Sequence, residues 1–292
     1  MAVTDLAAQA IANAFVSARN GGRSLSAFPG AIPATLADAY RVQDAAIALV
    51  GGHAPGNIGG WKVGRIPASQ AARYGADRLA GPILARAISI ADDTNRTSLR
   101  GHTFVGGFGA AEAEFLLRIG HPVPEGKTHF SLDQAAELIG DIHVGIEIAS
   151  SPLATINDLG PPVVVADFGN NNGLIIGPRI ENWRLVGLTD LSVALLIDGR
   201  EVGRGSAASF PDGPIGSVRF LLELLAARKI TVPEGTWISS GAITGVHDVV
   251  AGQRVEARFG DTMLSVECRI ANVARTDNSL NDSKTSTAQS VD

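Results

Sequence analysis

From Trp61 onward the chain is divided into short apolar runs separated by glycine, proline, asparagine and aspartate. Runs of this length, bounded by turn-forming residues, are typical of β-strands, because strands need few residues and end where the backbone turns. The run 191–197, followed by Asp198-Gly199 and a second run from Glu201, predicts a β-hairpin. The 292 residues, 45% of them hydrophobic and 34 of them glycine, give room for one large turn-rich domain, or for a large one with a small one.

The first sixty residues follow a helical pattern instead. Residues 4–20 predict a helix that stops at Gly21-Gly22, with these apolar residues on one face: Leu6, Ala10, Ile11, Ala14 and Phe15. A second helix is expected from Thr35, where Asp38 completes a capping-box-like start, until Gly51-Gly52. A small helical N-terminal part therefore precedes the β-rich body.

Two further helices interrupt the strands. One opens at Ser131, with Gln134 three residues later, and the other covers 218–229. After Arg275 the chain is polar and almost without apolar residues, which predicts disorder. We expect an α+β fold with three parts, which are a helical region over 1–59, a β-rich mixed domain over 60–275 and a disordered tail over 276–292.

Three glutamates predict a metal site. Glu112 and Glu114 lie one residue apart in a glycine-led apolar strand, so their side chains point to the same face. Glu147 lies in another apolar run that also reads as a strand. Two like charges on one face repel each other unless something positive sits between them, and three carboxylates suit a hard cation such as Mg²⁺ or Mn²⁺. The alternative is that Glu112 and Glu114 lie on the solvated face of an edge strand and Glu147 is an unrelated surface acid.

Charge and cysteine content exclude several partners and settings. The net charge is −5 without a basic run, so we expect neither nucleic acid nor an anionic membrane as a partner. A lone Cys268 rules out an intramolecular disulfide framework and fits a reducing cytosol. No segment reads as a signal peptide or a membrane span, so we expect a soluble cytoplasmic protein.

Lys62 is one of only four lysines and lies between Trp61 and Val63 in an apolar strand. Burial disfavours an ammonium ion, so we expect a lowered pKa for Lys62, as a lysine general acid or base needs. The alternative is a lysine whose stem packs on Trp61 while its ammonium group reaches water.

Five segments resemble a known family and occur in its order. They are Gly60-Trp61-Lys62-Val63-Gly64, Glu112-Ala113-Glu114, Gly145-Ile146-Glu147-Ile148, Val165-Ala166-Asp167 through Gly173-Leu174-Ile175-Ile176-Gly177, and Gly241-Ala242-Ile243-Thr244-Gly245 followed by Gly252. Together they resemble the 2-keto-4-pentenoate hydratase and 4-oxalocrotonate decarboxylase group of the fumarylacetoacetate hydrolase superfamily. The resemblance covers about residues 35–270. It implies a β-rich roll with a small helical N-terminal region.

The resemblance also implies roles for single residues. The three glutamates would hold Mg²⁺ or Mn²⁺, which chelates the carboxylate and 2-oxygen of a 2-oxo or 2-hydroxydienoic acid. Lys62 would act as the proton shuttle. Asp77 corresponds to an acid that relatives place near this lysine, although it could instead be a turn residue that pairs with Arg78.

One segment departs from the family pattern. Relatives typically continue after Ala-Asp with Asn-Ala-Ser, whereas this chain has Phe168-Gly169-Asn170-Asn171-Asn172. Asn170 or Asn171 is the nearest replacement for the missing serine, and its amide can still donate a hydrogen bond to a substrate oxygen. We therefore expect Asn170, Asn171 and Thr244 to bind the substrate. The alternative is that the asparagines only supply turn conformations.

The function expected first is a metal-dependent hydratase that converts a 2-hydroxyalka-2,4-dienoate to a 4-hydroxy-2-oxoalkanoate in the breakdown of meta-cleaved aromatic rings. The alternatives are a decarboxylase of a 2-oxo dicarboxylate, an acylpyruvate-type C–C hydrolase, and a non-catalytic partner subunit. The resemblance also implies a homo-oligomer that can associate with a related pathway enzyme.

Overall fold

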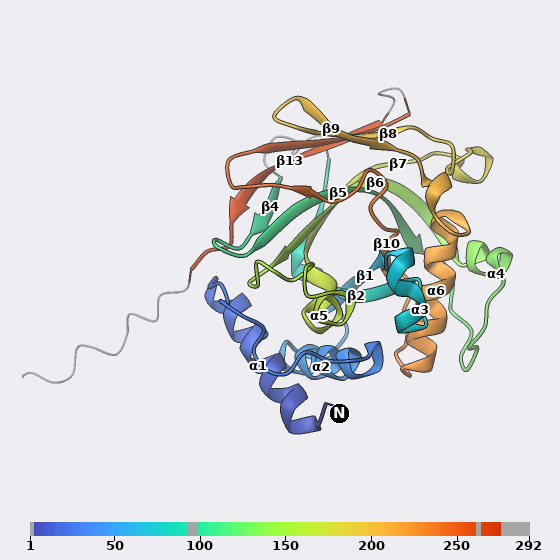
Figure 1. The fold of residues 1–292 in the computed structure, drawn as a ribbon. Coiled ribbons are helices and arrows are strands. Elements are labelled where there is room, and N and C mark those ends of the chain that lie inside the picture. Colours follow the sequence, from blue (N-terminus) through green and yellow to red (C-terminus); the bar gives the residue numbers. More distant parts are fainter. Residues whose placement is uncertain (1–2, 93–98, 261–263, 276–292) are drawn as a thin grey trace, which may run out of the picture.

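A computed structural model describes residues 3–92, 99–260 and 264–275. Two β-sheets lie one above the other, and most of the helices lie below and beside the larger sheet (Figure 1). This is the α+β, β-rich architecture expected from the sequence. The predicted tail over 276–292 falls outside the described residues.

The two N-terminal helices begin and end close to their predicted limits. Helix α1 (Asp5–Gly21) starts after Thr4, and helix α2 (Leu36–Leu49) starts after Thr35. The Thr35 hydroxyl accepts a 3.1 Å hydrogen bond from the Asp38 backbone N–H, as the capping pattern predicts. Phe15 is fully buried, but Leu6, which the helical pattern placed on the same face, is 86% exposed.

The other helices are short, with one exception. They are α3 (Ala68–Tyr74), α4 (Leu132–Glu137), α5 (Pro161–Ala166), α6 (Gly213–Ala227), and the 3-10 turns η1 (Ala85–Ala87), η2 (Phe168–Asn170), η3 (Trp183–Leu185) and η4 (Ala207–Ser209). The capping box at Ser131 and Gln134 is present at the start of α4. Helix α6 starts five residues before the predicted Val218, because Pro214 is tolerated in a first helical turn.

The larger sheet has the strand order β2-β1-β10-β5-β6-β7-β3, with β11 paired to β5. Its strands are β1 (Ile58–Arg65), β2 (Arg78–Leu84), β3 (Ile88–Ile90), β5 (Phe108–Ile119), β6 (Ile139–Ser151), β7 (Asn171–Arg179), β10 (Trp237–Ser239) and β11 (His247–Asp248). Strand β5 therefore lies between two neighbours and is not an edge strand.

The smaller sheet has the order β4-β13-β12-β8-β9. Its strands are β4 (Arg100–Thr103), β8 (Val193–Ile197), β9 (Arg200–Gly205), β12 (Arg254–Phe259) and β13 (Leu264–Asn272). Strands β8 and β9 form the predicted hairpin, with Asp198 and Gly199 at positive φ in its turn.

Strand alternation divides the side chains of β5 between two faces. Phe115 points toward the smaller sheet, where its ring centroid lies 5.4 Å from that of Phe259 on β12. One hydrophobic core joins residues of both sheets with Phe15 of α1 and Val42 of α2, so the helical N-terminal part packs against the β body. The division into a 1–59 region and a 60–275 domain stays a prediction. Among the described residues, no helix has the length and apolar character needed to cross a membrane.

Candidate metal centre and pocket

The three predicted glutamates come together on one face of the larger sheet. Glu112 on β5 pairs in register with Glu147 on β6, so the two side chains leave the same face of this antiparallel pair. Glu114 follows two residues later on β5 and shares that face. The three are buried, and one oxygen from each lies within 4.8 Å of the others. The alternative of a solvated edge strand is therefore wrong.

Lys62 reaches this cluster from β1, which is separated from β6 by two other strands. Its Nζ atom lies 3.2 Å from Glu147 Oε1 and donates a 3.1 Å hydrogen bond to Asn170 Oδ1. The contact across this span requires the sheet to curl around the cluster. Since Lys62 is only 4% exposed, the alternative in which its ammonium group reaches water is wrong.

In two of the three glutamates, Glu114 and Glu147, one carboxylate oxygen accepts hydrogen bonds from the protein. Glu114 Oε2 accepts hydrogen bonds from Ser239 Oγ and from the Gly241 backbone N–H at 2.8 Å. Glu147 Oε1 accepts a 3.0 Å hydrogen bond from Asn171 Nδ2. The other oxygens, Glu114 Oε1 and Glu147 Oε2, are buried and receive no hydrogen bond from the residues that the structure describes. Buried carboxylate oxygens rarely stay without a partner, so these two oxygens are suited to contact a cation.

Glu112 and Glu114 hold protons more tightly than ordinary glutamates. Burial raises the pKa of Glu112 to about 7, although Lys62 opposes the rise. Burial, Glu147 and Glu112 together raise the pKa of Glu114 well above its ordinary value. Both shifts are expected where several carboxylates share a dry site without a bound cation.

The expectation for the pKa of Lys62 was wrong in direction. Burial alone lowers this pKa, but the attraction of Glu147, Glu112 and Glu114 outweighs burial and raises the pKa above its ordinary value. The apolar neighbours in the strand predict only the effect of burial, whereas the fold brings three carboxylates to the ammonium group. Lys62 is therefore an ammonium ion in the metal-free protein.

The cluster fits a divalent cation in charge and in donor type. Three carboxylates and one ammonium leave two negative charges when all are ionised, which a dication neutralises. The donors are all oxygen atoms, as Mg²⁺ and Mn²⁺ prefer. Ligands of one Mg²⁺ at about 2.1 Å lie at most about 4.2 Å apart, so a small contraction of the observed 4.8 Å arrangement suffices.

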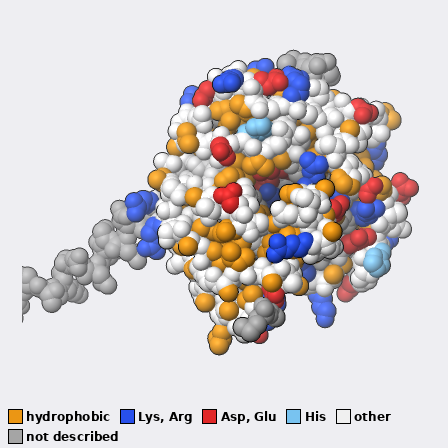
Figure 2. Space-filling view, viewed as in Figure 1, with side chains coloured by type: hydrophobic (Ala, Val, Ile, Leu, Met, Phe, Trp, Pro, Cys, Tyr) orange, Lys and Arg blue, Asp and Glu red, His pale blue; other side chains and the backbone are white. Residues whose placement is uncertain are grey.

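A pocket of about 370 Å³ opens onto the cluster. Lys62 and Glu112 line its charged part, Asn170 lies beside them, and Leu79 and Val164 supply apolar wall. Figure 2 shows a hollow near the middle of the viewed face, with acidic and basic atoms visible below the surface. The cluster is thus buried but can be reached by a small molecule.

Arg65, Asn157 and Ser239 were not singled out from the sequence. Arg65 lines the pocket, donates from Nη1 to the Ser209 carbonyl at 2.9 Å, and stacks over the ring of Phe210. Asn157 accepts a 3.1 Å hydrogen bond from Asn170 Nδ2. Arg65 lies three residues after Lys62 in one strand, a spacing that predicts opposite faces, so no signal in the sequence pointed to Arg65. Asn157 and Ser239 lie far away in sequence from the residues that they contact.

Two predicted residues are placed differently from the rest. Asp77 is half-exposed, its carboxylate pairs with Arg78 at 3.1 Å, and it is not among the residues that line the pocket. The structure therefore does not bring Asp77 to Lys62 and supports the alternative of a turn residue. Thr244 lies between pocket residues Ala242 and Gly245, and its buried Oγ1 has no hydrogen-bond partner among the described residues. A substrate role for Thr244 stays a prediction.

Comparison with known proteins gives this geometry a context. Over 96 residues, or 33% of the chain, the sequence is 35% identical to a 4-oxalocrotonate decarboxylase of Pseudomonas putida, and this match spans 36% of that enzyme's length. The fold is similar to a solved 4-oxalocrotonate decarboxylase from Pseudomonas putida G7 complexed with magnesium and adipate. The TM-score is 0.75 and the identity 24%, over 92% of this chain and 98% of the other. No family model matches the chain.

The local sequence match and the shared fold agree with the resemblance to the fumarylacetoacetate hydrolase superfamily. A second solved structure with a similar fold is the fumarylpyruvate hydrolase from Pseudomonas aeruginosa in complex with Mn²⁺ and pyruvate. The TM-score is 0.53 and the identity 19%, over 73% of this chain and 89% of the other. These two solved neighbours contain Mg²⁺ or Mn²⁺. The buried acidic triad of this chain could bind a divalent ion of the same class.

Proposed function

We propose that this protein is a divalent-metal-dependent decarboxylase of an unsaturated 2-oxo dicarboxylate of the 4-oxalocrotonate kind. The supporting observation is that the local sequence match and the solved structure similar over nearly the whole chain both carry that name. From the sequence alone, a hydratase is expected first and this decarboxylase is the alternative. The comparisons favour the decarboxylase and give no support to the hydratase.

The cluster supports this proposal through its charge. Glu112, Glu114 and Glu147 would hold the ion, and a bound dication supplies Lewis-acid stabilisation of negative charge on the 2-oxygen of a 2-oxo acid. Asn171 fixes the orientation of Glu147, while Ser239 fixes that of Glu114. These contacts hold the acids in place before a ligand arrives.

Arg65 makes the pocket suitable for a dicarboxylate. It is the one cationic side chain besides Lys62 among the described residues that line the pocket. A guanidinium carries five N–H donors, and Arg65 donates one hydrogen bond, to the Ser209 carbonyl. Its remaining donors suit the second carboxylate of a substrate whose 2-oxo acid end lies at the glutamates. A monocarboxylic hydratase substrate would leave Arg65 without this partner.

Lys62 is placed to supply the proton that decarboxylation requires. The bond between carbon and the leaving carboxylate breaks, its electron pair moves through the conjugated carbons onto the 2-oxygen, and CO₂ departs. The dienolate that remains must then take up one proton, at the 2-oxygen or at a carbon of the conjugated chain. The raised pKa of Lys62 keeps its ammonium group protonated, as a proton donor beside the substrate must be.

The direct test is the product formed from each candidate substrate. The purified protein is incubated with Mg²⁺ and, separately, with an unsaturated 2-oxo dicarboxylate, a 2-hydroxydienoate and an acylpyruvate. We expect release of CO₂ from the dicarboxylate only, abolished by EDTA and by Glu147→Gln. Addition of water to the dienoate without CO₂ release would support the hydratase in place of the decarboxylase. Cleavage of the acylpyruvate would support the C–C hydrolase, and inactivity toward all three would support a non-catalytic subunit.

A further inference from the structure

The segment 168–172 is a wall between the candidate site and a second pocket. Asn170 lines the site pocket, whereas Phe168, Asn171 and Asn172 line a pocket of about 390 Å³ on the other side. The same wall carries both amides that contact the cluster, since Asn170 accepts from Lys62 and Asn171 donates to Glu147. The position of this short segment therefore sets two contacts of the metal centre.

The backbone of the wall is strained. Phe168, Gly169 and Asn170 have φ values of 54°, 64° and 56°, three successive residues in the left-handed region. Glycine adopts this region readily and asparagine tolerates it, but phenylalanine rarely does, so the conformation at Phe168 in particular requires restraint by surrounding contacts. Gly81 on β2 lets the turn approach closely, because a Cβ atom there would lie 2.1 Å from the Phe168 carbonyl oxygen.

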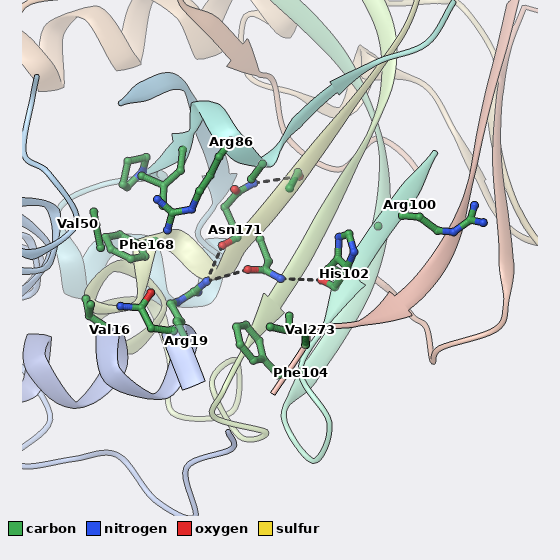
Figure 3. Close-up of a pocket in the computed structure, with 18 of the residues that line it drawn as sticks. Val16, Arg19, Val50, Arg86, Arg100, His102, Phe104, Phe168, Asn171 and Val273 are labelled. Carbon is green, nitrogen blue, oxygen red and sulfur yellow. Dashed lines mark hydrogen bonds between the residues drawn. The ribbon is translucent and has the colours of Figure 1, made fainter. Parts of the chain in front are cut away.

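Arg19, near the end of helix α1, supplies that restraint. Its guanidinium donates to both carboxylate oxygens of Asp167, at 2.5 and 2.9 Å, and to the Asn171 carbonyl at 3.1 Å. It also donates to Asn172 Oδ1 and lies between the rings of Phe104 and Phe168, at 5.5 and 5.3 Å (Figure 3). One side chain thus fixes both ends of the strained turn.

We propose that Arg19 is a positioning residue that sets the orientation of Asn170 and Asn171 toward Lys62 and Glu147. It touches neither the glutamates nor the pocket onto which they open. Its effect passes through the Asn171 backbone, which Arg19 holds from one side while the Asn171 amide holds Glu147 on the other. The proposal uses the metal site of the proposed function but does not depend on the reaction.

The test compares Arg19→Lys with Arg41→Lys. Arg41 is a matched control because it also donates from an N-terminal helix to a carboxylate and a backbone carbonyl, those of Asp5 and Val3, but away from the wall. Lysine keeps the charge in both variants and removes the fork-shaped set of donors. Mn²⁺ affinity is measured on each folded protein, and amide hydrogen exchange of residues 167–173 is measured on the metal-free forms.

We expect Arg19→Lys to bind Mn²⁺ about tenfold more weakly, the usual scale for residues that orient a metal ligand. Exchange over 167–173 should accelerate in Arg19→Lys and stay unchanged in Arg41→Lys. Asn171→Ala should weaken Mn²⁺ binding similarly, and combining it with Arg19→Lys should add little.

If Arg19→Lys lowers only the melting temperature, with exchange over 167–173 and Mn²⁺ affinity as in the wild type, Arg19 merely anchors helix α1 and the proposal is overturned. A wild-type protein that binds no Mn²⁺ would refute the proposed function instead. The exchange comparison would still decide the role of Arg19 in that case.

Discussion

Two buried charged clusters lie on opposite sides of the wall 168–172, and they differ in how their charges are balanced. In one, Arg19 faces Asp167, both carboxylate oxygens of Asp167 accept hydrogen bonds, and Ser151 Oγ adds a further bond of 2.6 Å. In the other, Lys62 faces three glutamates, and Glu114 Oε1 and Glu147 Oε2 have no hydrogen-bond partner among the described residues.

The difference separates a structural ion pair from a binding site. A buried ion pair is tolerated when each charge is neutralised and each oxygen accepts a hydrogen bond, as at Asp167. A cluster that keeps excess negative charge and free oxygens in a dry interior is costly without a cation. The Lys62 cluster therefore has the form of a site completed by a ligand, while the Arg19 cluster is complete in itself.

Removing one glutamate charge from the incomplete cluster should have the largest effect. Glu147→Gln keeps the side-chain volume but removes a charge that binds the cation, so we expect turnover to fall roughly 1,000-fold or more. Glu114→Gln should act alike. Steady-state assays at saturating Mg²⁺, with circular dichroism as the check on folding, measure this. Full activity in either variant would contradict the metal site.

Charge removal should have opposite consequences for the stability of the two clusters. Asp167→Asn leaves Arg19 buried without its counter-ion and should destabilise the fold by about 3–5 kcal/mol. Glu114→Gln relieves repulsion, so the metal-free variant should be as stable as the metal-free wild type or more stable. Urea unfolding in EDTA measures both. Equal losses of stability in the two variants would contradict the claim that one cluster is a structural ion pair and the other a binding site.

Lys62→Met should reduce turnover by roughly 100-fold or more, the scale of general acid–base contributions. Mn²⁺ binding should persist, because the variant removes a positive charge and leaves the three carboxylates. Lys62→Arg should not restore turnover, since a guanidinium does not give up its proton. Near-wild-type turnover in Lys62→Met would assign proton transfer to another group.

Arg65→Met should raise KM for a 2-oxo dicarboxylate by about tenfold, because a hydrogen bond to a charged group is lost. KM for a 2-oxo monocarboxylate should change little. Arg73→Met is the matched control, since Arg73 stacks on Tyr74 and is not among the pocket residues. An equal rise in KM for both substrates would show that Arg65 does not bind the second carboxylate of the substrate.

The pH should have a smaller effect, both on Mn²⁺ affinity and on the stability of the metal-free protein. Because burial raises the pKa of Glu112 to about 7, its proton competes with a cation below that pH. Mn²⁺ affinity should therefore fall as the pH drops below about 7 and level off above it. The metal-free protein should lose stability as the pH rises from about 4.5 to about 7, since the folded state holds the proton longer than the unfolded state does. Titrations at several pH values test both trends.

The sequence predicted what depends on local periodicity. The shared face of Glu112 and Glu114, the caps at Thr35 and Ser131, and the Asp198-Gly199 turn are set by a few neighbouring residues, and the structure confirms them. The β-rich body follows from the same kind of pattern.

What the sequence could not predict depends on contacts between distant segments. The pKa of Lys62 is decided by carboxylates on strands that only the fold brings near, and Arg19 looks like an ordinary polar residue at a helix end. Leu6 fits the apolar face by spacing, but none of the elements in the described part of the chain covers it enough to bury it. Helix α5, with Pro161-Pro162 at its start, is too short to give a periodic signal.

The central claim is that the incomplete cluster binds a divalent cation, and anomalous scattering from a crystal grown or soaked with Mn²⁺ tests it most directly. We predict one strong peak between Glu112, Glu114 and Glu147, with six oxygen ligands, three of them from these residues, at about 2.1–2.2 Å. A crystal saturated with Mn²⁺ that has no peak there, and in which Lys62 is still the one cation beside the three carboxylates, would contradict the account.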